Sequence, residues 1–192
     1  KNNLQLVVSM INLQKQMITD TGVSEALEEA QLRVHSMSML HEHLHQSADV
    51  GSIQLGDYLA SILSHALGLA RSGVSIKSEV DADPCSIDLE QGVHLGLIVN
   101  ELVTNAVKHA FPGGETGVVG LKVEATENYT RIVVRDNGVG IAPEMQRSGS
   151  MGMQIIRTLT EQVGGTLELN NEGGTTWVIS VPRQRDRVTL GR

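Results

Sequence analysis

Three polar side chains of different chemistry recur at helical spacing in the run NELVTNAVKHAF, residues 100–111. Glu101, Asn105 and Lys108 follow one another at +4 and +3, so they stack on one face of a predicted helix. A neighbouring stripe of the same helix is apolar and consists of Leu95, Val99, Leu102 and Ala106. A carboxylate, an amide oxygen and an ammonium in one line suit a magnesium-bound polyphosphate. An exposed helix face with a single ion pair would show the same pattern, so this segment alone leaves both interpretations open.

A second polar feature follows a predicted strand downstream. Asp136 shares the face of Ile132 and Val134, so its carboxylate should point inward, where it needs hydrogen-bond donors. The next residues, Asn137-Gly138-Val139-Gly140, favour a tight turn, and the glycines allow a ligand to approach the backbone. By itself such a glycine pair is more often an ordinary turn than a nucleotide site.

A third feature opens the following helix. Gly149-Ser150-Met151-Gly152 precedes an apolar-periodic segment, and glycines at a helix N-terminus expose amides at the positive end of the dipole, which favours phosphate. Arg147 in the preceding loop is placed either to reach a phosphate or to remain solvated. These two features gain weight only when they occur together with the polar helix.

The elements that must position these residues divide into two predicted domains. Residues 1–50 read as two amphipathic helices joined by a short break, a helical hairpin that forms half of a four-helix bundle. The polar stretch from Ser47 to Ser52 reads as the linker. Residues 51–185 form the second domain, and residues 186–192 a tail.

The second domain mixes helical and strand periodicity. Asp88 should cap the long helix, with Gln91 as its capping-box partner. The last hairpin crosses the turn 171–174. The remaining predicted elements are a helix at 56–70, a strand near 74–80, two strands between 119 and 136, and a helix at about 152–163. We therefore expect an α+β fold, with a layer of helices on an antiparallel-rich sheet.

Composition excludes several classes of protein. The net charge of −7 argues against a nucleic-acid binder. The single cysteine, Cys85, excludes an internal disulfide framework and fits a reducing compartment. No apolar run approaches the roughly 20 residues that span a bilayer, and no signal peptide is visible, so a cytoplasmic location is expected. The chain begins with Lys1 rather than Met, so we expect a fragment, with a sensor domain or membrane anchor upstream.

The order of these motifs resembles the GHKL ATPase superfamily, over about residues 53–182. That group contains the gyrase-type ATPases, the heat-shock chaperone ATPase, the sensor histidine kinases and the mismatch-repair ATPases. The resemblance implies an α/β sandwich that binds ATP and Mg²⁺ without a Walker loop, and no such loop occurs in this sequence.

The resemblance also assigns roles along the polar helix. Asn105 would be the magnesium ligand, and Lys108 would face phosphate. Glu101 would orient or deprotonate the attacking group. His109 would either flank the phosphates or pack at the helix end.

The remaining roles lie around the glycine turns. Asp136 would accept a hydrogen bond from the adenine amino group, and Thr175 would lie near the adenine. Gly138 and Gly140 would shape the adenine pocket. The hinge of a lid on the phosphate side would be formed by the last pair of glycines, Gly149 and Gly152.

The first residues narrow the choice within the superfamily. Lys-Asn-Asn-Leu-Gln at 1–5 looks like the dimerisation helix of the sensor histidine kinases, which in one subfamily reads His-Arg-x-Lys-Asn-Asn-Leu-Gln. The related HWE group has His-Glu-Leu where this chain has Asn100-Glu101-Leu102, and a Trp-x-Glu that is missing here, so the chain is placed in the sister subfamily. The phosphoacceptor histidine of that motif would lie just before Lys1, so this fragment should not phosphorylate itself.

The resemblance thus implies the ATP-dependent histidine kinase core of a two-component system. Such an enzyme transfers the γ-phosphoryl group to a histidine and then to an aspartate of a response regulator, and a homodimer would form through the hairpin. Two alternatives remain open. Glu101 also occupies the general-base position of a GHKL ATPase that hydrolyses ATP to drive conformational change, and a nucleotide-binding module without catalysis would carry the same motifs.

Overall fold

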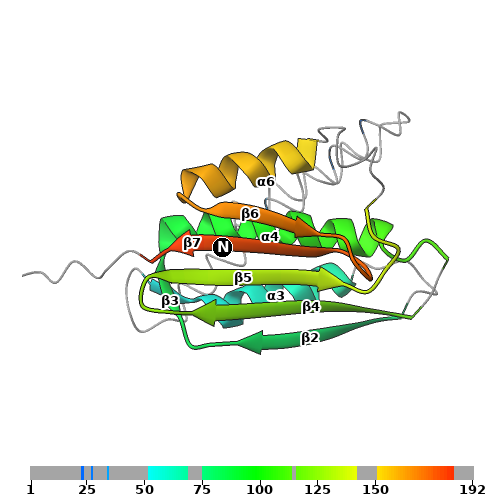
Figure 1. Cartoon of the computed structure of the whole chain (residues 1–192), viewed down its shortest axis with the longest axis horizontal. Helices are drawn as coiled ribbons and strands as arrows, with labels where there is room; N and C mark the ends of the chain where they lie inside the picture. Colours follow the sequence, from blue (N-terminus) through cyan, green and yellow to red (C-terminus); the bar gives the residue numbers. More distant parts are fainter. Residues whose placement is uncertain are drawn as a thin grey trace, which may run out of the picture.

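The structure is a computed structural model that describes residues 52–68, 75–113, 116–141 and 151–183, together with residues 23, 27 and 34. Apart from those three positions, the predicted hairpin of residues 1–50 lies outside the described residues, and so does the predicted tail. The division into domains therefore stays a prediction. Figure 1 shows the arrangement of the second domain, in which helices cover one face of a sheet.

A five-stranded mixed sheet forms one layer of this domain. Its strand order is β2-β4-β5-β7-β6. β2 runs parallel to β4, and the other three pairings are antiparallel. The strands are β2 (Ile76–Ala82), β4 (Gly117–Ala125), β5 (Tyr129–Asp136), β6 (Thr166–Asn170) and β7 (Thr176–Pro182). The α+β sandwich expected from the sequence is confirmed.

The described helices that cover the sheet are α3 (Leu55–Gly68), α4 (Leu89–His109) and α6 (Met151–Gln162). The apolar stripe predicted on the long helix is buried throughout, at Leu95, Val99, Leu102 and Ala106. It packs with the inward residues of the two central strands, which are Val119, Leu121, Val123, Ile132 and Val134. None of the helices in the described ranges combines the length and apolar character of a membrane-spanning segment.

Helix α4 begins where the sequence predicts. Asp88 has extended backbone angles and accepts a hydrogen bond from the backbone N of Gln91 at 2.8 Å. The predicted capping box is only half formed, because the side chain of Gln91 donates to the carbonyl oxygen of Pro182 at 3.4 Å. Gln91 thus ties the first turn of α4 to the end of β7, which places this helix on the sheet.

A small second sheet joins the start of the domain to the start of α4. β1 (Ser52–Gln54) pairs antiparallel with β3 (Ser86–Asp88), and Ile53 lies opposite Ile87 with both side chains buried. The assignment of Ser52 to a linker was wrong, since this residue already pairs with Asp88. The pairing ties the residues that precede α3 to the residues that precede α4.

Helices α3 and α4 meet at a glycine. A Cβ atom added to Gly96 would lie 2.0 Å from the hydroxyl oxygen of Tyr58, so only a glycine admits this ring against α4. Burial raises the pKa of Tyr58 above its usual value. This contact fixes one flank of the helix whose other flank carries the candidate site.

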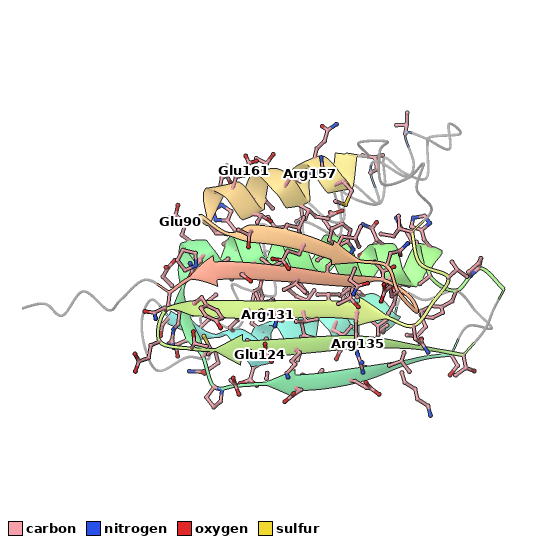
Figure 2. The ribbon with its side chains drawn as sticks, viewed as in Figure 1. Glu90, Glu124, Arg131, Arg135, Arg157 and Glu161 are labelled. Atoms are coloured by element: carbon pink, nitrogen blue, oxygen red, sulfur yellow. The ribbon has the colours of Figure 1, made fainter. Side chains whose placement is uncertain are left out.

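The opposite face of the sheet carries exposed ion pairs. Arg135 on β5 crosses the glycine at position 120 of β4 to reach Glu79 on β2. Lys122 binds Glu124 at 2.8 Å and holds the pKa of that carboxyl below its usual value. Figure 2 labels Glu124 and Arg135 on these strands. These charges pair with one another, and such exposed pairs contribute little to stability.

Candidate functional site

The carboxylate of Asp136 forms the centre of the candidate site. It ends β5, follows the inward positions of Ile132 and Val134, and is only 9% exposed. Its Oδ1 atom accepts hydrogen bonds from the backbone N of Gly138 at 2.9 Å and of Thr175 at 3.2 Å. No hydrogen bond from the described residues reaches Oδ2. The predicted inward orientation is therefore confirmed, and one oxygen is held in place while the other can accept a further donor.

The start of β7 lies directly beside this carboxylate. The backbone N of Asp136 donates to the carbonyl oxygen of Thr175 at 2.8 Å, and Thr175 itself is buried. Gly174 has a φ of +116°, and a Cβ atom added there would lie 2.1 Å from the carbonyl oxygen of Asp136. Only glycine fits this close approach, so the Gly-Thr step brings Thr175 beside Asp136, and its place near an adenine stays a prediction.

The two glycines after Asp136 place the turn against the end of α4. The backbone N of Val139 donates to the carbonyl oxygen of Ala110 at 3.0 Å, and a Cβ atom added to Gly138 would lie 2.2 Å from that oxygen. Gly140 has a φ of +74°, a value that glycine adopts without strain. The turn therefore brings Asp136 and the C-terminal end of α4 into one region, and the side chain of Val139 stays 66% exposed there.

The polar stripe of α4 runs from the interior to the surface. Glu101 is buried with 5% exposure, Asn105 is half-buried, and Lys108 is exposed in the last turn. A Cβ atom added to Gly152 would lie 3.1 Å from Oε2 of Glu101, so the first turn of α6 packs against that carboxylate. The structure thus joins two predicted site residues that are 51 positions apart in the sequence.

Two predicted site residues, Arg147 and Gly149, lie outside the described residues, and their roles stay predictions. His109, the last residue of α4, is exposed.

Two asparagines beside the site were missed by the sequence analysis. The side chain of Asn137 accepts a hydrogen bond from the backbone N of Val118 at 2.7 Å, which extends the pairing of β4 and β5 past Asp136. The side chain of Asn171 binds both backbone groups of Ile141. An asparagine beside a glycine-rich turn often bonds the backbone in this way, so the signal was present in both segments.

The donor set of α4 fits a metal that is shared with phosphate. Among the residues that the structure describes, no three His, Cys, Asp or Glu side chains gather into a metal site of their own. Mg²⁺ usually takes one or two protein oxygens and completes its shell with phosphate oxygens and water. The amide oxygen of Asn105, half-buried on the face that also carries Glu101 and Lys108, matches that requirement.

These features together define a class of protein: an α/β sandwich in which a buried carboxylate at the end of a strand lies near a helix that carries a carboxylate, an amide and an ammonium on one face. Comparison with protein families agrees with this class. Residues 90–185 match the family described as histidine kinase-, DNA gyrase B- and HSP90-like ATPase, and residues 1–70 match a family described as histidine kinase. The chain belongs to the histidine kinase-, DNA gyrase B- and HSP90-like ATPase family, and the GHKL resemblance is confirmed.

Individual relatives are sensor kinases. The chain is 32% identical to the sensor histidine kinase PdtaS of Mycobacterium tuberculosis, over 99% of this chain and 39% of that protein. It is 30% identical to blue-light-activated histidine kinase 2 of Erythrobacter litoralis, over 99% of this chain and 56% of that protein. The solved histidine kinase domain of the EL346 blue-light-activated kinase of that organism superposes with a TM-score of 0.71 at 29% identity, covering 95% of this chain and 86% of that one. The chain thus spans less than two thirds of the full length of PdtaS and of blue-light-activated histidine kinase 2.

Proposed function

We propose that this chain is the core of an ATP-dependent protein-histidine kinase. It would transfer the γ-phosphoryl group of ATP to a histidine and then to an aspartate of a response-regulator receiver domain. The observation that carries the proposal is the carboxylate of Asp136, with Oδ1 fixed by two backbone donors and Oδ2 left for a ligand. The family match and the sensor-kinase relatives support this reading over a ligand of another class.

On the base side, Oδ2 of Asp136 would accept a hydrogen bond from the exocyclic amino group of adenine. A hydrogen bond to an ionised acceptor is stronger than one between neutral groups. Thr175 lies beside this carboxylate, and Gly138, whose backbone N binds its Oδ1 atom, packs closely against Ala110. These groups would give the site its preference for a base that presents a donor at that position.

On the phosphate side, the polar face of α4 would bind Mg²⁺ and the phosphates. Asn105 would offer its amide oxygen to Mg²⁺, and Lys108 would approach the phosphates from the exposed last turn. Bound Mg²⁺ would supply neutralisation of the phosphate charge. Glu101, buried against Gly152, would orient the attacking imidazole or accept its proton.

The acceptor chemistry suits histidine. A neutral imidazole nitrogen is a nucleophile near pH 7, and most of the acceleration in phosphoryl transfer comes from positioning and charge stabilisation. The N-terminal segment would supply a dimer interface through its helical hairpin, and the two copies would present the acceptor to the nucleotide. The match of residues 1–70 to a histidine kinase family supports this assignment.

Labelling of the full-length protein with ATP tests the proposal. Label from [γ-³²P]ATP should appear on the protein and be lost in acid but retained in alkali, whereas [α-³²P]ATP should give none. At ATP concentrations near the wild-type Kd, Asn105→Ala and Asp136→Asn should strongly reduce labelling, and Glu79→Gln, in an exposed ion pair on the other face, should not. Steady release of phosphate without label on the protein would overturn the kinase assignment in favour of an ATPase. Failure to bind any nucleotide would overturn both the kinase and the ATPase assignments.

A further inference from the structure

The side chain of Asn171 clamps a backbone segment that lies 30 residues away in the sequence. Its Oδ1 accepts a hydrogen bond from the backbone N of Ile141 at 2.7 Å, and its Nδ2 donates to the carbonyl oxygen of Ile141 at 2.8 Å. One amide thus satisfies both backbone groups of a residue, as a neighbouring strand does in an antiparallel pair. The two contacts also fix the orientation of the amide, because a flipped side chain would face donor with donor and acceptor with acceptor.

The clamped residue belongs to the Asp136–Ile141 loop and lies five residues after Asp136. At its start, this loop is bound to the same β6–β7 turn, through the hydrogen bond from the backbone N of Thr175 to Asp136. In its middle, the backbone N of Val139 is bound to the carbonyl oxygen of Ala110. Near its start, Asn137 also binds Val118 of β4. The Asn171 amide adds the attachment at Ile141, so the β6–β7 turn binds this loop both at Asp136 and at Ile141.

The loop depends on these attachments because its own sequence does not restrain it. Gly138 and Gly140 occupy two of its positions, and glycine has more backbone freedom to lose than any other residue. Gly140 turns the chain with a φ of +74°, and a Cβ atom there would lie 2.7 Å from Oδ1 of Asn171. The clamp therefore sits directly against the flexible point of the loop.

We propose that Asn171 is a positioning residue for the nucleotide site: it holds the Asp136–Ile141 loop in the geometry that binds the base. The inference rests on the function proposed above, since it assumes that the base binds at Asp136. Release of Ile141 would free the loop, so that binding would have to order Gly138 and its hydrogen bond to Asp136 again. Preorganisation of this kind acts on affinity, and the Asn171 amide, whose oxygen and nitrogen both bind Ile141, would have no part in the transfer step.

A matched control exists in the adjacent residue. Asn170 also uses its side chain to accept a backbone hydrogen bond, from the N of Glu172 at 2.9 Å, but this bond stays within the turn. Asn171→Leu keeps the approximate size of the side chain and removes both hydrogen bonds to Ile141. Asn170→Ala removes a bond of the same kind without touching the loop. Any effect on the turn alone should therefore be common to the two variants.

The test measures the Kd for Mg·ATP of the chain by calorimetry and the rate of histidine labelling of the full-length protein at saturating ATP. Loss of two hydrogen bonds should raise the Kd of Asn171→Leu by about 5- to 30-fold. Labelling at saturation should stay within about twofold of the wild type. Asn170→Ala should stay within about twofold in both measurements. Asn171→Ala should reproduce the rise in Kd, which guards against a fold defect specific to the leucine.

Amide hydrogen exchange gives an independent measure of the clamp. Exchange at the backbone N of Ile141 should accelerate in Asn171→Leu and not in Asn170→Ala. Equal Kd values in the two variants, or a slower labelling rate at saturation with an unchanged Kd, would overturn the inference and leave the proposed function intact. A wild-type chain that binds no ATP, or that binds it equally well as Asp136→Asn, would instead overturn the proposed function and this inference with it.

Discussion

Replacement of Asp136 by asparagine reverses the chemistry of one atom while it preserves the local fold. In the wild type, Oδ1 accepts from the backbone N of Gly138 at 2.9 Å and of Thr175 at 3.2 Å. The asparagine oxygen can accept both bonds, because it has two lone-pair positions. The amide NH₂ group then replaces Oδ2, so a donor faces the place where the adenine amino group would bind.

The magnitude follows from the bond that is lost. A hydrogen bond to a charged acceptor contributes about 1.5–3 kcal/mol, which corresponds to a rise of about 10- to 150-fold in the Kd for Mg·ATP. Two opposed donors add to this loss. The fold should lose less than about 1 kcal/mol, since both backbone donors keep an acceptor. Guanine presents an acceptor where adenine presents a donor, so the affinity for GTP relative to ATP should rise.

The assay is calorimetric titration of wild type and Asp136→Asn with Mg·ATP and Mg·GTP, next to urea unfolding of both. The reasoning predicts a large loss of ATP affinity, a shift of preference toward GTP, and a nearly unchanged free energy of unfolding. If the folded variant binds ATP within twofold of the wild type, Asp136 is not the adenine acceptor and the base-side assignment fails. If unfolding becomes easier by several kcal/mol, the carboxylate serves the fold rather than a ligand.

Three further substitutions test separate parts of the account. Gly96→Ala should cost about 1–3 kcal/mol of stability in urea unfolding, because the new methyl group would lie 2.0 Å from the hydroxyl of Tyr58. Gly68→Ala meets open space and should be near neutral. Equal losses of stability in the two variants would refute the packing argument. Asn105→Ala should remove most of the enhancement of ATP binding by Mg²⁺, and a Mg²⁺ titration that matches the wild type would exclude this ligand. Gly138→Ala would put a methyl group 2.2 Å from the carbonyl oxygen that follows α4, so calorimetry should show impaired ATP binding, and unaltered binding would show that the turn yields freely.

Much of the fold follows from local periodicity. A short stretch of sequence predicts each of three features: the stripe on α4, the inward face of β5, and the hairpin of β6 and β7. In each case burial repeats at the period of the element. The N-cap at Asp88 is equally local, and its hydrogen bond to Gln91 spans three residues. Such features depend on neighbours in the chain, and the structure agrees with them.

The features that were missed depend on distant partners. β1 and β3 contain three residues each, too few to show a period, and their pairing joins residues more than 30 positions apart. The side chain of Gln91 could complete a local capping box, but it instead binds the carbonyl oxygen of Pro182. Pro182 lies near Gln91 only because β7 pairs with β5 in the sheet.

The candidate site divides in the same way. The inward position of Asp136 could be predicted from its two apolar neighbours on β5. The donors that hold its Oδ1 come partly from Thr175, which is 39 residues away, and the clamp of Asn171 on Ile141 spans 30 residues. The packing of Gly152 on Glu101 also needs the tertiary fold. The residues predicted to contact a ligand therefore follow from local patterns, whereas the hydrogen bonds and packing that hold them come from distant parts of the chain.

The central claim is that a nucleotide binds at the strand-end carboxylate and the adjoining face of α4. Amide resonances of the ¹⁵N-labelled chain during titration with Mg·ATP test it most directly. Saturable shifts are expected at Gly138 and Thr175, whose backbone N–H groups bind Asp136. In Asp136→Asn the same shifts should need at least about tenfold more ATP. Shifts confined to the opposite face of the sheet, around Glu79 and Lys122, or no shifts at all, would contradict it.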